Sequence, residues 1–418
     1  MRRADATRLY YALQLLLSMP TWVVTAVYLV QELHLSPLQL VLMGTAMEGA
    51  VFLSEFPTGV VADTYSRRLS LIIGYLGMGL AWMLVGAFST AWVIIALWAV
   101  WGIAYTFTSG AWQAWLTDEV GIEKASRLFL IGARLQYVGA FVGLLWQVAI
   151  AVGWSLRAGV IAGGAVTVLC GLICIVSMPE TGFRRRPRAE RGSALAEMRS
   201  TAASGIRFAW AAPVILMLIG VELFMGMSSE AFDRLKEAHF LRNIGLPAVG
   251  DLDPVIWFAI FWVAGMILGF VATTFLIKRF ARHGRRIVTS GLFTLTLMEM
   301  ATMLVFALTG STWLAIAAIL GVFFARDLQG PLYTIWLNEQ ITDSSVRATV
   351  LSISGQANAI GQAVGGPVLG AIGNVWGIGT ALATGACAIA PALGLYGRAI
   401  AHEGREPELD ELPAAEPV

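Results

Sequence analysis

The sequence predicts an all-α polytopic membrane protein with 12 transmembrane helices in two pseudo-symmetric six-helix bundles. Apolar residues make up 57% of the 418 positions and charged residues only 13%, against about 25% charged residues in a typical soluble domain. The apolar residues gather in stretches of about 20, the length that one bilayer-spanning helix needs. Short motifs of the first half of the chain recur in the second half, which indicates a duplicated unit.

The expected spans follow one another with short connections. They cover residues 9–33, 38–62, 69–88, 91–116, 127–152, 154–178, 208–232, 254–277, 287–308, 312–337, 348–373 and 375–399. The first stretch is too long for the core of a signal peptide and is interpreted as a span. After the seventh span, the charges of residues 230–240 alternate in sign at helical spacing, which predicts a short surface helix with a solvated His239.

Lysine and arginine positions orient the chain in the membrane. Most of the 28 Lys and Arg residues fall in cytoplasmic segments if the N-terminus is inside, as the positive-inside rule requires. We therefore expect a multi-pass protein of the cell inner (cytoplasmic) membrane with both termini cytoplasmic. Residues 1–180 are the expected N-terminal bundle, 181–207 a basic cytoplasmic linker, 208–400 the C-terminal bundle and 401–418 a disordered tail.

Composition also argues against several classes of protein. The formal net charge of +1 gives no indication of a nucleic-acid partner. Three cysteines in apolar stretches, without a Cys/His cluster, predict buried thiols and no metal site. The sequence has no phosphate-binding GxxxxGKS/T loop, so energy must come from an ion gradient or from the substrate's own gradient. We expect no enzymatic activity and no cofactor, but a monomer with a small-molecule substrate, protons and membrane lipids as partners.

The internal repeat consists of short matches at a nearly constant spacing of just over half the chain. Trp115-Leu116 recurs as Trp336-Leu337, and Gln136 recurs as Gln356. Two six-helix units related by an axis along the membrane normal, with a site between them, form a transporter architecture.

One loop carries a recognisable motif. Between the second and third expected spans stands Gly59-Val60-Val61-Ala62-Asp63-Thr64-Tyr65-Ser66-Arg67-Arg68. It resembles the signature loop of the major facilitator superfamily, Gly-x-x-x-Asp-(Arg/Lys)-x-(Gly/Ser)-Arg-(Arg/Lys), in both sequence and position. The preceding Glu55-Phe56-Pro57-Thr58-Gly59 is similar to the form found in the drug-efflux (drug:proton antiporter) branch of that superfamily.

This resemblance implies the major facilitator fold and a gating role for Gly59, Asp63, Arg67 and Arg68. Gly59 allows close helix approach, Asp63 can face the N-terminus of a neighbouring helix, and the two arginines can pair across the inner mouth. The alternative interpretation is a topogenic turn with basic anchors.

The sequence also departs from the family pattern. Thr64 replaces the usual basic residue, and Ala281 stands where the second-half copy of the loop would carry its aspartate. The Arg-x-x-x-Gly element of span four occurs instead in span ten, as Arg326 and Gly330, and the Gly-Pro pair of span five occurs in span eleven, as Gly366-Pro367. The changes at Thr64 and Ala281 predict an asymmetric inner latch, and the two displaced elements argue against antiport by the family's usual residues.

Charged residues inside spans are functional candidates, because each costs about 2.5–3.5 kcal/mol at the bilayer centre. The proton-coupling candidates are Glu222, Asp327, Arg326, Glu48, Glu55 and Arg134. Glu222 lies near the middle of span seven and is the first choice for an acid that loads and releases a proton. The alternative is a permanent pair of Glu222 with Arg326 or with another helix, which would fix helix packing.

Other intramembrane charges have structural interpretations. Glu48 and Glu55 are seven residues apart and therefore lie on one helix face. Arg134 can neutralise either of them and so order two helices. Glu299 lies in span nine, which the family resemblance places on the outside of the bundle, and is expected to be structural.

The family resemblance implies that spans one, four, seven and ten line a central cavity. The substrate-cavity candidates are Trp112, Gln113, Phe224, Met227, Gln329 and Tyr333. Aromatic faces attract cations and methionine repacks around varied shapes, so such a wall fits lipophilic, often cationic drugs. The alternative role for each of these side chains is ordinary helix packing.

We therefore predict a secondary active transporter that exports lipophilic small molecules by alternating access, coupled to protons. A second hypothesis keeps the fold but assigns uptake or export of a specific metabolite by symport or uniport. This hypothesis is favoured if side-chain amides make specific hydrogen bonds to the solute. The candidate amides are Gln14, Gln113, Gln329 and Gln356. A third hypothesis is a non-transporting membrane receptor on the same scaffold.

Overall fold

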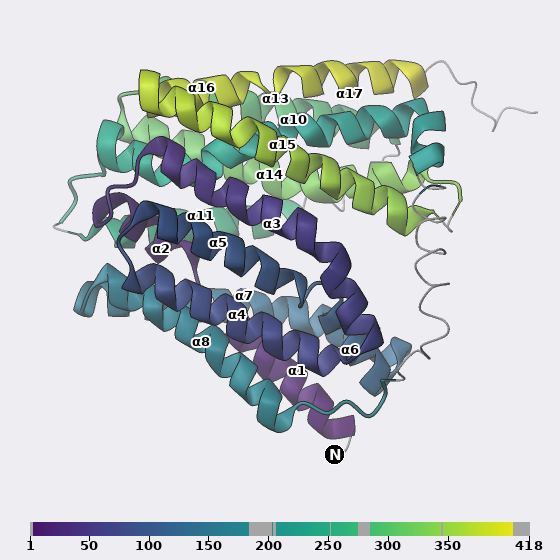
Figure 1. Cartoon of the computed structure of the whole chain (residues 1–418). Coiled ribbons are helices and arrows are strands. Elements are labelled where there is room, and N and C mark those ends of the chain that lie inside the picture. Colours follow the sequence, from purple (N-terminus) through teal and green to yellow (C-terminus); the bar gives the residue numbers. More distant parts are fainter. Residues whose placement is uncertain are drawn as a thin grey trace, which may run out of the picture.

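The computed structural model of the chain is a bundle of long helices (Figure 1). It describes residues 3–183, 203, 206–250, 252–274, 285–343 and 346–403, and these ranges contain no β-strand. The all-helical fold class is therefore confirmed. The basic linker, the second-half loop around Ala281 and the C-terminal tail fall wholly or largely outside the described residues.

The first half of the chain folds into helices that cross the bundle six times. These are α1 (Arg3–Leu17), α2 (Trp22–Gln31), α3 (Pro37–Thr64), α4 (Arg67–Ala87), α5 (Ala91–Thr106), α6 (Ala111–Val120), α7 (Ile122–Gly153) and α8 (Leu156–Ser177). The helices begin where the sequence supplies caps. Ser36, for example, forms a capping box with Gln39 at the start of α3, where Pro37 takes the first helical position.

The first and fourth expected spans are broken rather than continuous, which corrects the prediction. The chain leaves the helix between α1 and α2 at residues 18–21, because Pro20 lacks an amide hydrogen and disfavours helical geometry in the residue before it. Thr21 then caps α2. Between α5 and α6, Gly110 has a φ of 72°, a left-handed conformation that suits glycine.

In the described part of the second half, the helices equivalent to the two broken spans are continuous, and a break lies between the last two helices instead. The second half contains α10 (Pro213–His239), η2 (Phe240–Ile244), α11 (Pro254–Ala272), α13 (Arg285–Leu308), α14 (Thr312–Gln340), α15 (Arg347–Trp376), α16 (Ile378–Cys387) and α17 (Ala390–Glu403). Eleven segments of the described residues are long and apolar enough to cross a membrane. The expected span 348–373 is not among them because α15 is rich in Gly, Gln, Asn and Ser, but its 30 residues reach about 45 Å.

Residues 230–240 do not form the surface helix that their charges predicted. They belong to α10 and the first residue of η2, and Phe232, Leu235 and Phe240 are fully buried. The charges are satisfied inside the protein, since Arg234 pairs with Glu230 one helical turn away. His239 is also buried, with Nε2 3.2 Å from the carbonyl oxygen of Phe306. Its expected solvation was wrong.

The two halves meet at one end of the bundle, which we call the seam end. There α3 packs against α10 and α15, α2 packs against α10 and α11, and α7 packs against α11. The side chain of Asn374 accepts a hydrogen bond from the amide of Leu38 at 2.9 Å, and Arg242 donates to the carbonyl of Leu35 at 2.8 Å. Toward the opposite end, which carries the Asp63–Arg68 loop and is called the motif end, the helices of the two halves diverge (Figure 1).

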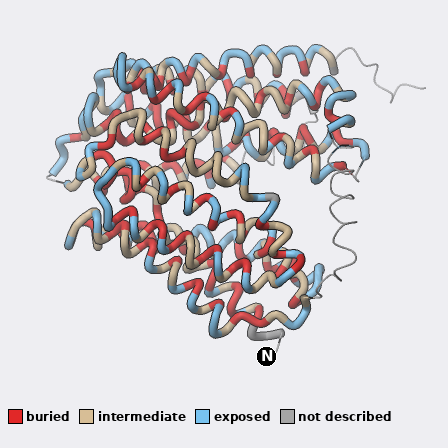
Figure 2. The backbone as a smooth tube through the Cα atoms, in the orientation of Figure 1, coloured by how far each residue is buried: buried red, intermediate tan, exposed pale blue. Residues whose placement is uncertain are grey.

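Burial follows the arrangement of the helices. Buried positions gather on the faces that helices turn toward one another, whereas the outer faces are exposed (Figure 2). Large apolar side chains are among the exposed ones, for example Leu53 on α3 and Val176 on α8. A surface of this kind is suited to contact with lipid chains, because its side chains are apolar and its helical backbone satisfies its own hydrogen bonds.

Candidate functional site

The motif loop ties together helix ends of the first half. Arg67 forms an ion pair with Asp118 near the end of α6. The carboxylate of Glu180 accepts hydrogen bonds from the Ser66 hydroxyl at 2.7 Å and from the Arg68 amide at 2.9 Å. The Arg68 guanidinium donates to the Ile175 carbonyl. Both arginine side chains therefore bond within their own half and do not pair across the mouth.

The two other motif residues differ from the expectation as well. No atom lies within 4 Å of the position that a side chain at Gly59 would take, so no close helix approach depends on this glycine. Asp63 is exposed at the last turn of α3 and has no hydrogen bond or ion pair within the described residues.

An ionic cluster around the buried Glu299 joins three helices of the second half. Arg326 on α14 donates from Nε to Glu299 on α13 at 2.6 Å and from a terminal nitrogen to Asp233 on α10 at 2.8 Å. Gln329 donates to the other Glu299 oxygen at 3.0 Å. Arg326 also lies over the Phe232 ring, 4.8 Å from its centroid. The cluster thus holds the positions of α10, α13 and α14.

Glu222 is not part of this cluster and does not pair with Arg326, but it bonds to another helix, as the structural alternative allowed. Its carboxylate accepts a hydrogen bond from Asn358 of α15 at 2.7 Å, and the Asn358 oxygen in turn accepts from Gln362 at 2.8 Å. A neutral amide network therefore links Glu222 to α15. Asp327 lies on another face of α14, where its carboxylate touches Gly269 of α11.

The expected pairing of Arg134 was also wrong. Arg134 is exposed on α7 and has no ion pair in the described part of the chain. Glu55 is exposed and accepts a hydrogen bond from Ser109 at 3.2 Å. Glu48 is half-buried on α3.

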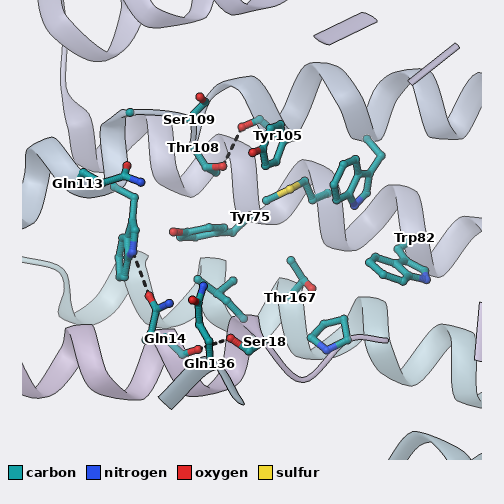
Figure 3. Close-up of a pocket in the computed structure, with 16 residues that line it drawn as sticks. Gln14, Ser18, Tyr75, Trp82, Tyr105, Thr108, Ser109, Gln113, Gln136 and Thr167 are labelled. Atoms are coloured by element: carbon teal, nitrogen blue, oxygen red, sulfur yellow. Dashed lines mark hydrogen bonds between the residues drawn. The ribbon is translucent and has the colours of Figure 1, made fainter. Parts of the chain in front are cut away.

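A cavity of about 450 Å³ lies within the first half, at the breaks between α1 and α2 and between α5 and α6 (Figure 3). Its lining residues are Gln14, Leu17, Ser18, Pro20, Tyr75, Met78, Trp82, Trp101, Tyr105, Thr108, Ser109, Gly110, Trp112, Gln113, Gln136 and Thr167. None of them is charged at neutral pH. Most are aromatic, amide or hydroxyl side chains, and we call this space the first cavity.

Aromatic rings of the first cavity are held by stacking and hydrogen bonds. The Trp112 indole donates to the Gln14 side chain at 3.2 Å, and its ring stacks on Tyr10 with centroids 5.3 Å apart. Trp101 and Tyr105 are almost parallel, with centroids 5.5 Å apart. Flat rings fixed in this way offer faces on which a planar ligand can stack.

Side-chain amides supply hydrogen-bonding groups in the same space. Gln113 and Gln136 are exposed at the first cavity, and their side chains have no hydrogen-bond partner in the described residues. Figure 3 shows Tyr75 of α4 reaching toward the space between Gln14 and Thr108. The helix breaks add backbone groups without helical partners, a feature of substrate sites in transporters.

The remaining cavity candidates of the second half do not line this space. Gln329 and Tyr333 are buried, and the Tyr333 hydroxyl bonds to Ser354 at 2.7 Å and to the Leu218 carbonyl at 3.1 Å. Met227 on α10 packs against Gly365 of α15. Phe224 is half-buried on the same helix.

Two groups of lining residues were missed in the sequence. Tyr75 and Trp82 lie on α4, the third span, and nothing in the pattern of that span separates them from packing residues. Gln136 was visible, because it recurs as Gln356 in the repeat, and a repeated amide inside a span is a usable signal for a polar cavity.

The fold and this cavity define the class of protein: a multi-pass membrane protein of the transporter type, with two similar halves and a ligand-sized space beside broken helices. A sequence profile of the Major Facilitator Superfamily matches residues 9–366. The chain belongs to this family.

Individual relatives are distant in sequence. The chain is 19% identical over 372 residues to the uncharacterized MFS-type transporter YxaM of Bacillus subtilis (strain 168), with 86% of each chain covered. Among solved structures, a mutant of the nucleoside transporter NupG superposes with a TM-score of 0.76 at 13% identity, covering 95% of this chain and 99% of that one. The peptide transporter POT in complex with sulfate gives 0.73 at 14% identity, covering 96% and 94%. These likenesses show the fold.

Proposed function

We propose that the chain is a secondary transporter that moves small, uncharged, ring-bearing molecules through the first cavity by alternating access. The single observation that carries this proposal is the lining of the first cavity, which offers stacked aromatic rings and unpaired amides but no charge. A charged solute would lose its hydration there without gaining a counter-ion, at a large cost. An uncharged planar solute loses less water and gains ring contacts and hydrogen bonds.

Glu222 is the proposed coupling acid. Its hydrogen-bond partner is the neutral Asn358 amide, whereas Glu299, Asp233 and Glu230 are paired with arginines. A carboxyl group with a neutral partner can gain or lose a proton without breaking an ion pair. Protonation of Glu222 is therefore the step that we assign to coupling.

Export is the proposed direction, because the Glu55–Arg68 segment resembles the drug-efflux branch. In this proposal both termini and the motif end face the cytoplasm of a bacterial-type inner membrane. Gly59, Asp63, Arg67 and Arg68 form a gate whose arginines change partners when the motif end closes.

Uptake of a specific metabolite is the second candidate function. The polar amides Gln14, Gln113 and Gln136 in one cavity favour it, since side-chain amides discriminate between solutes by their hydrogen-bonding groups. The structural likeness to a nucleoside transporter adds nucleosides to the solutes that should be tried.

Binding to the purified protein tests the substrate class. Trp82, Trp101 and Trp112 line the first cavity, so quenching of tryptophan fluorescence reports occupancy. Uridine, adenosine, resorcinol and coumarin represent uncharged ring-bearing solutes, and tetraphenylphosphonium and ethidium represent lipophilic cations. We expect saturable quenching by at least one uncharged solute and weaker quenching by the cations. Quenching by the cations alone would refute the proposed substrate class.

A variant pair assigns the signal to the first cavity. Gln136→Leu should weaken binding by about two- to tenfold, the value of one net hydrogen bond. Gln356→Leu makes the same change at the repeat-related position, which does not line the first cavity, and should leave binding unchanged. Direction follows from accumulation in efflux-deficient cells: a lower level that rises with a protonophore indicates export, and a higher level indicates uptake.

A further inference from the structure

A second cavity, of about 350 Å³, lies between the two halves. Its lining residues are Ser18, Ala133, Gln136, Tyr137, Ala140, Trp262 and Met266. Four of these come from α7 and two from α11, so the cavity is bounded by one helix of each half. Its character differs from that of the first cavity, because most of its wall is apolar or aromatic.

The wall on each side is one regular helix face. Ala133, Gln136, Tyr137 and Ala140 follow one another at steps of three, one and three residues, which places them on a single stripe of α7. Trp262 and Met266 are four residues apart on α11. The two alanines leave space opposite the larger side chains of α11.

The second cavity adjoins the first. Ser18 and Gln136 line both spaces. Ser18 lies at the break after α1. A ligand that occupies the first cavity therefore has apolar space directly beside it.

The surroundings of the second cavity are those of a lipid-facing surface. On α7, Tyr137 is 62% exposed and Val138 is 52% exposed, and on α11, Ile267 is 56% exposed and Phe270 67%. Exposed apolar side chains on membrane-spanning helices lie against acyl chains. An apolar group can thus reach the second cavity from the hydrocarbon region.

We propose that the second cavity holds the apolar chain of an amphipathic substrate whose uncharged polar ring lies in the first cavity. This inference rests on the proposed function and narrows its substrate class to rings that carry an alkyl chain. The occupant is thus part of the transported molecule. A resident phospholipid chain in the same space is the competing outcome of the test.

Resorcinol and hexylresorcinol are the probes, because they share one uncharged ring with two hydroxyl groups and differ only in the alkyl chain. Affinities are measured on the purified protein against the free aqueous concentration of each probe. Each methylene that enters the second cavity should tighten binding by about fourfold. The ratio of the two affinities therefore reports the chain alone.

Two variants change the size of the second cavity. Ala140→Trp fills it, and we expect hexylresorcinol binding to weaken at least tenfold while resorcinol binding stays within twofold of wild type. Ala149→Trp places the same side chain at an exposed position of the same helix that lines neither cavity, and both affinities should stay unchanged. Met266→Ala enlarges the cavity and should move the preferred alkyl chain to a longer one.

The outcomes separate this inference from the function on which it rests. If resorcinol binds but the affinity ratio is the same in wild type, Ala140→Trp and Met266→Ala, the chain lies elsewhere and the inference is overturned. Loss of co-purified phospholipid from Ala140→Trp at an unchanged ratio overturns it in favour of a resident lipid. If neither probe nor any other uncharged ring binds the wild type, the proposed function fails as well.

Discussion

A methyl group at Gly44 is expected to open the seam between the two halves. A side chain there would overlap the Glu230 carboxylate and the Arg234 guanidinium of α10, which lie against α3. These two side chains are only 2% and 12% exposed, and Arg234 also lies over the Trp22 ring at 5.0 Å. The clashing atoms belong to flexible side chains, but both side chains are buried at the seam, so moving them aside disturbs either their ion pair or the packing of the seam. In Gly44→Ala, the Glu230–Arg234 ion pair and the closed seam therefore compete for the same space.

The size of the effect follows from the ion pair. Removal of one partner of a buried pair costs about 3–5 kcal/mol. Gly44→Ala keeps both partners and only displaces them, so we expect a smaller cost of about 1.4 kcal/mol or more, which corresponds to a factor of ten. The variant should therefore lower the population with a closed seam, relative to the population with an open one, by about tenfold or more. Gly49→Ala is the matched control, since it lies on the same helix and nothing lies within 4 Å of its added carbon.

Labelling of a buried cysteine measures this shift. Val41 is fully buried and lies beside Gly366 of α15 across the seam, so Val41→Cys in a background without the three natural cysteines is protected while the seam is closed. The rate of reaction with a water-soluble maleimide on the purified protein should rise at least tenfold in Gly44→Ala and stay at the parental value in Gly49→Ala. Equal labelling rates in the two variants would show that a methyl group at residue 44 does not open the seam.

Two further predictions concern the charged groups of the second half. Arg326→Met leaves the carboxylates of Asp233 and Glu299 without their cation, so the free energy of unfolding should fall by about 3–5 kcal/mol; thermal unfolding of the purified variant checks this, and wild-type stability would contradict it. Glu222→Gln keeps a side chain that can bond to Asn358 but removes the proton site. We expect it to lose protonophore-sensitive accumulation and to retain counterflow in proteoliposomes, and loss of neither would show that Glu222 is structural.

Much of the fold was predictable because the length of the apolar stretches is a strong signal in a membrane protein. The all-helical class and the membership in the major facilitator superfamily are confirmed. The resemblance to the drug-efflux branch and the domain boundaries stay predictions. The helix breaks escaped notice because Pro20 and Gly110 stand inside apolar stretches, where composition alone does not show whether a helix continues.

The prediction of a surface helix from the charges of residues 230–240 was wrong for a different physical reason. Charges at helical spacing are typical of a solvated surface, but here Glu230 and Arg234 neutralise each other inside the protein, and the apolar residues between them fill the core. Spacing within one helix cannot reveal which other helices cover it. The structural role expected for Glu299 agrees with its bonds to Arg326, although the sequence did not name that partner.

The candidate site was predictable only in part. Trp112 and Gln113 line the first cavity, as expected for span four, whereas Gln329 and Tyr333 are occupied by partners within the second half. The difference depends on the rotation of α14 about its axis. Packing against neighbouring helices sets this rotation, and the sequence of one span does not contain it.

Solute counterflow in proteoliposomes tests the central claim most directly, because it requires both binding in the first cavity and movement across the membrane. Labelled uncharged ring-bearing solutes are compared with labelled lipophilic cations, for the wild type, the double variant Gln113→Leu/Gln136→Leu and the control Gln356→Leu. We expect counterflow of at least one uncharged solute. The affinity for that solute should be at least tenfold lower in the double variant and unchanged in the control. Counterflow of the cations alone, or equal affinity in the double variant and the wild type, would contradict the central claim.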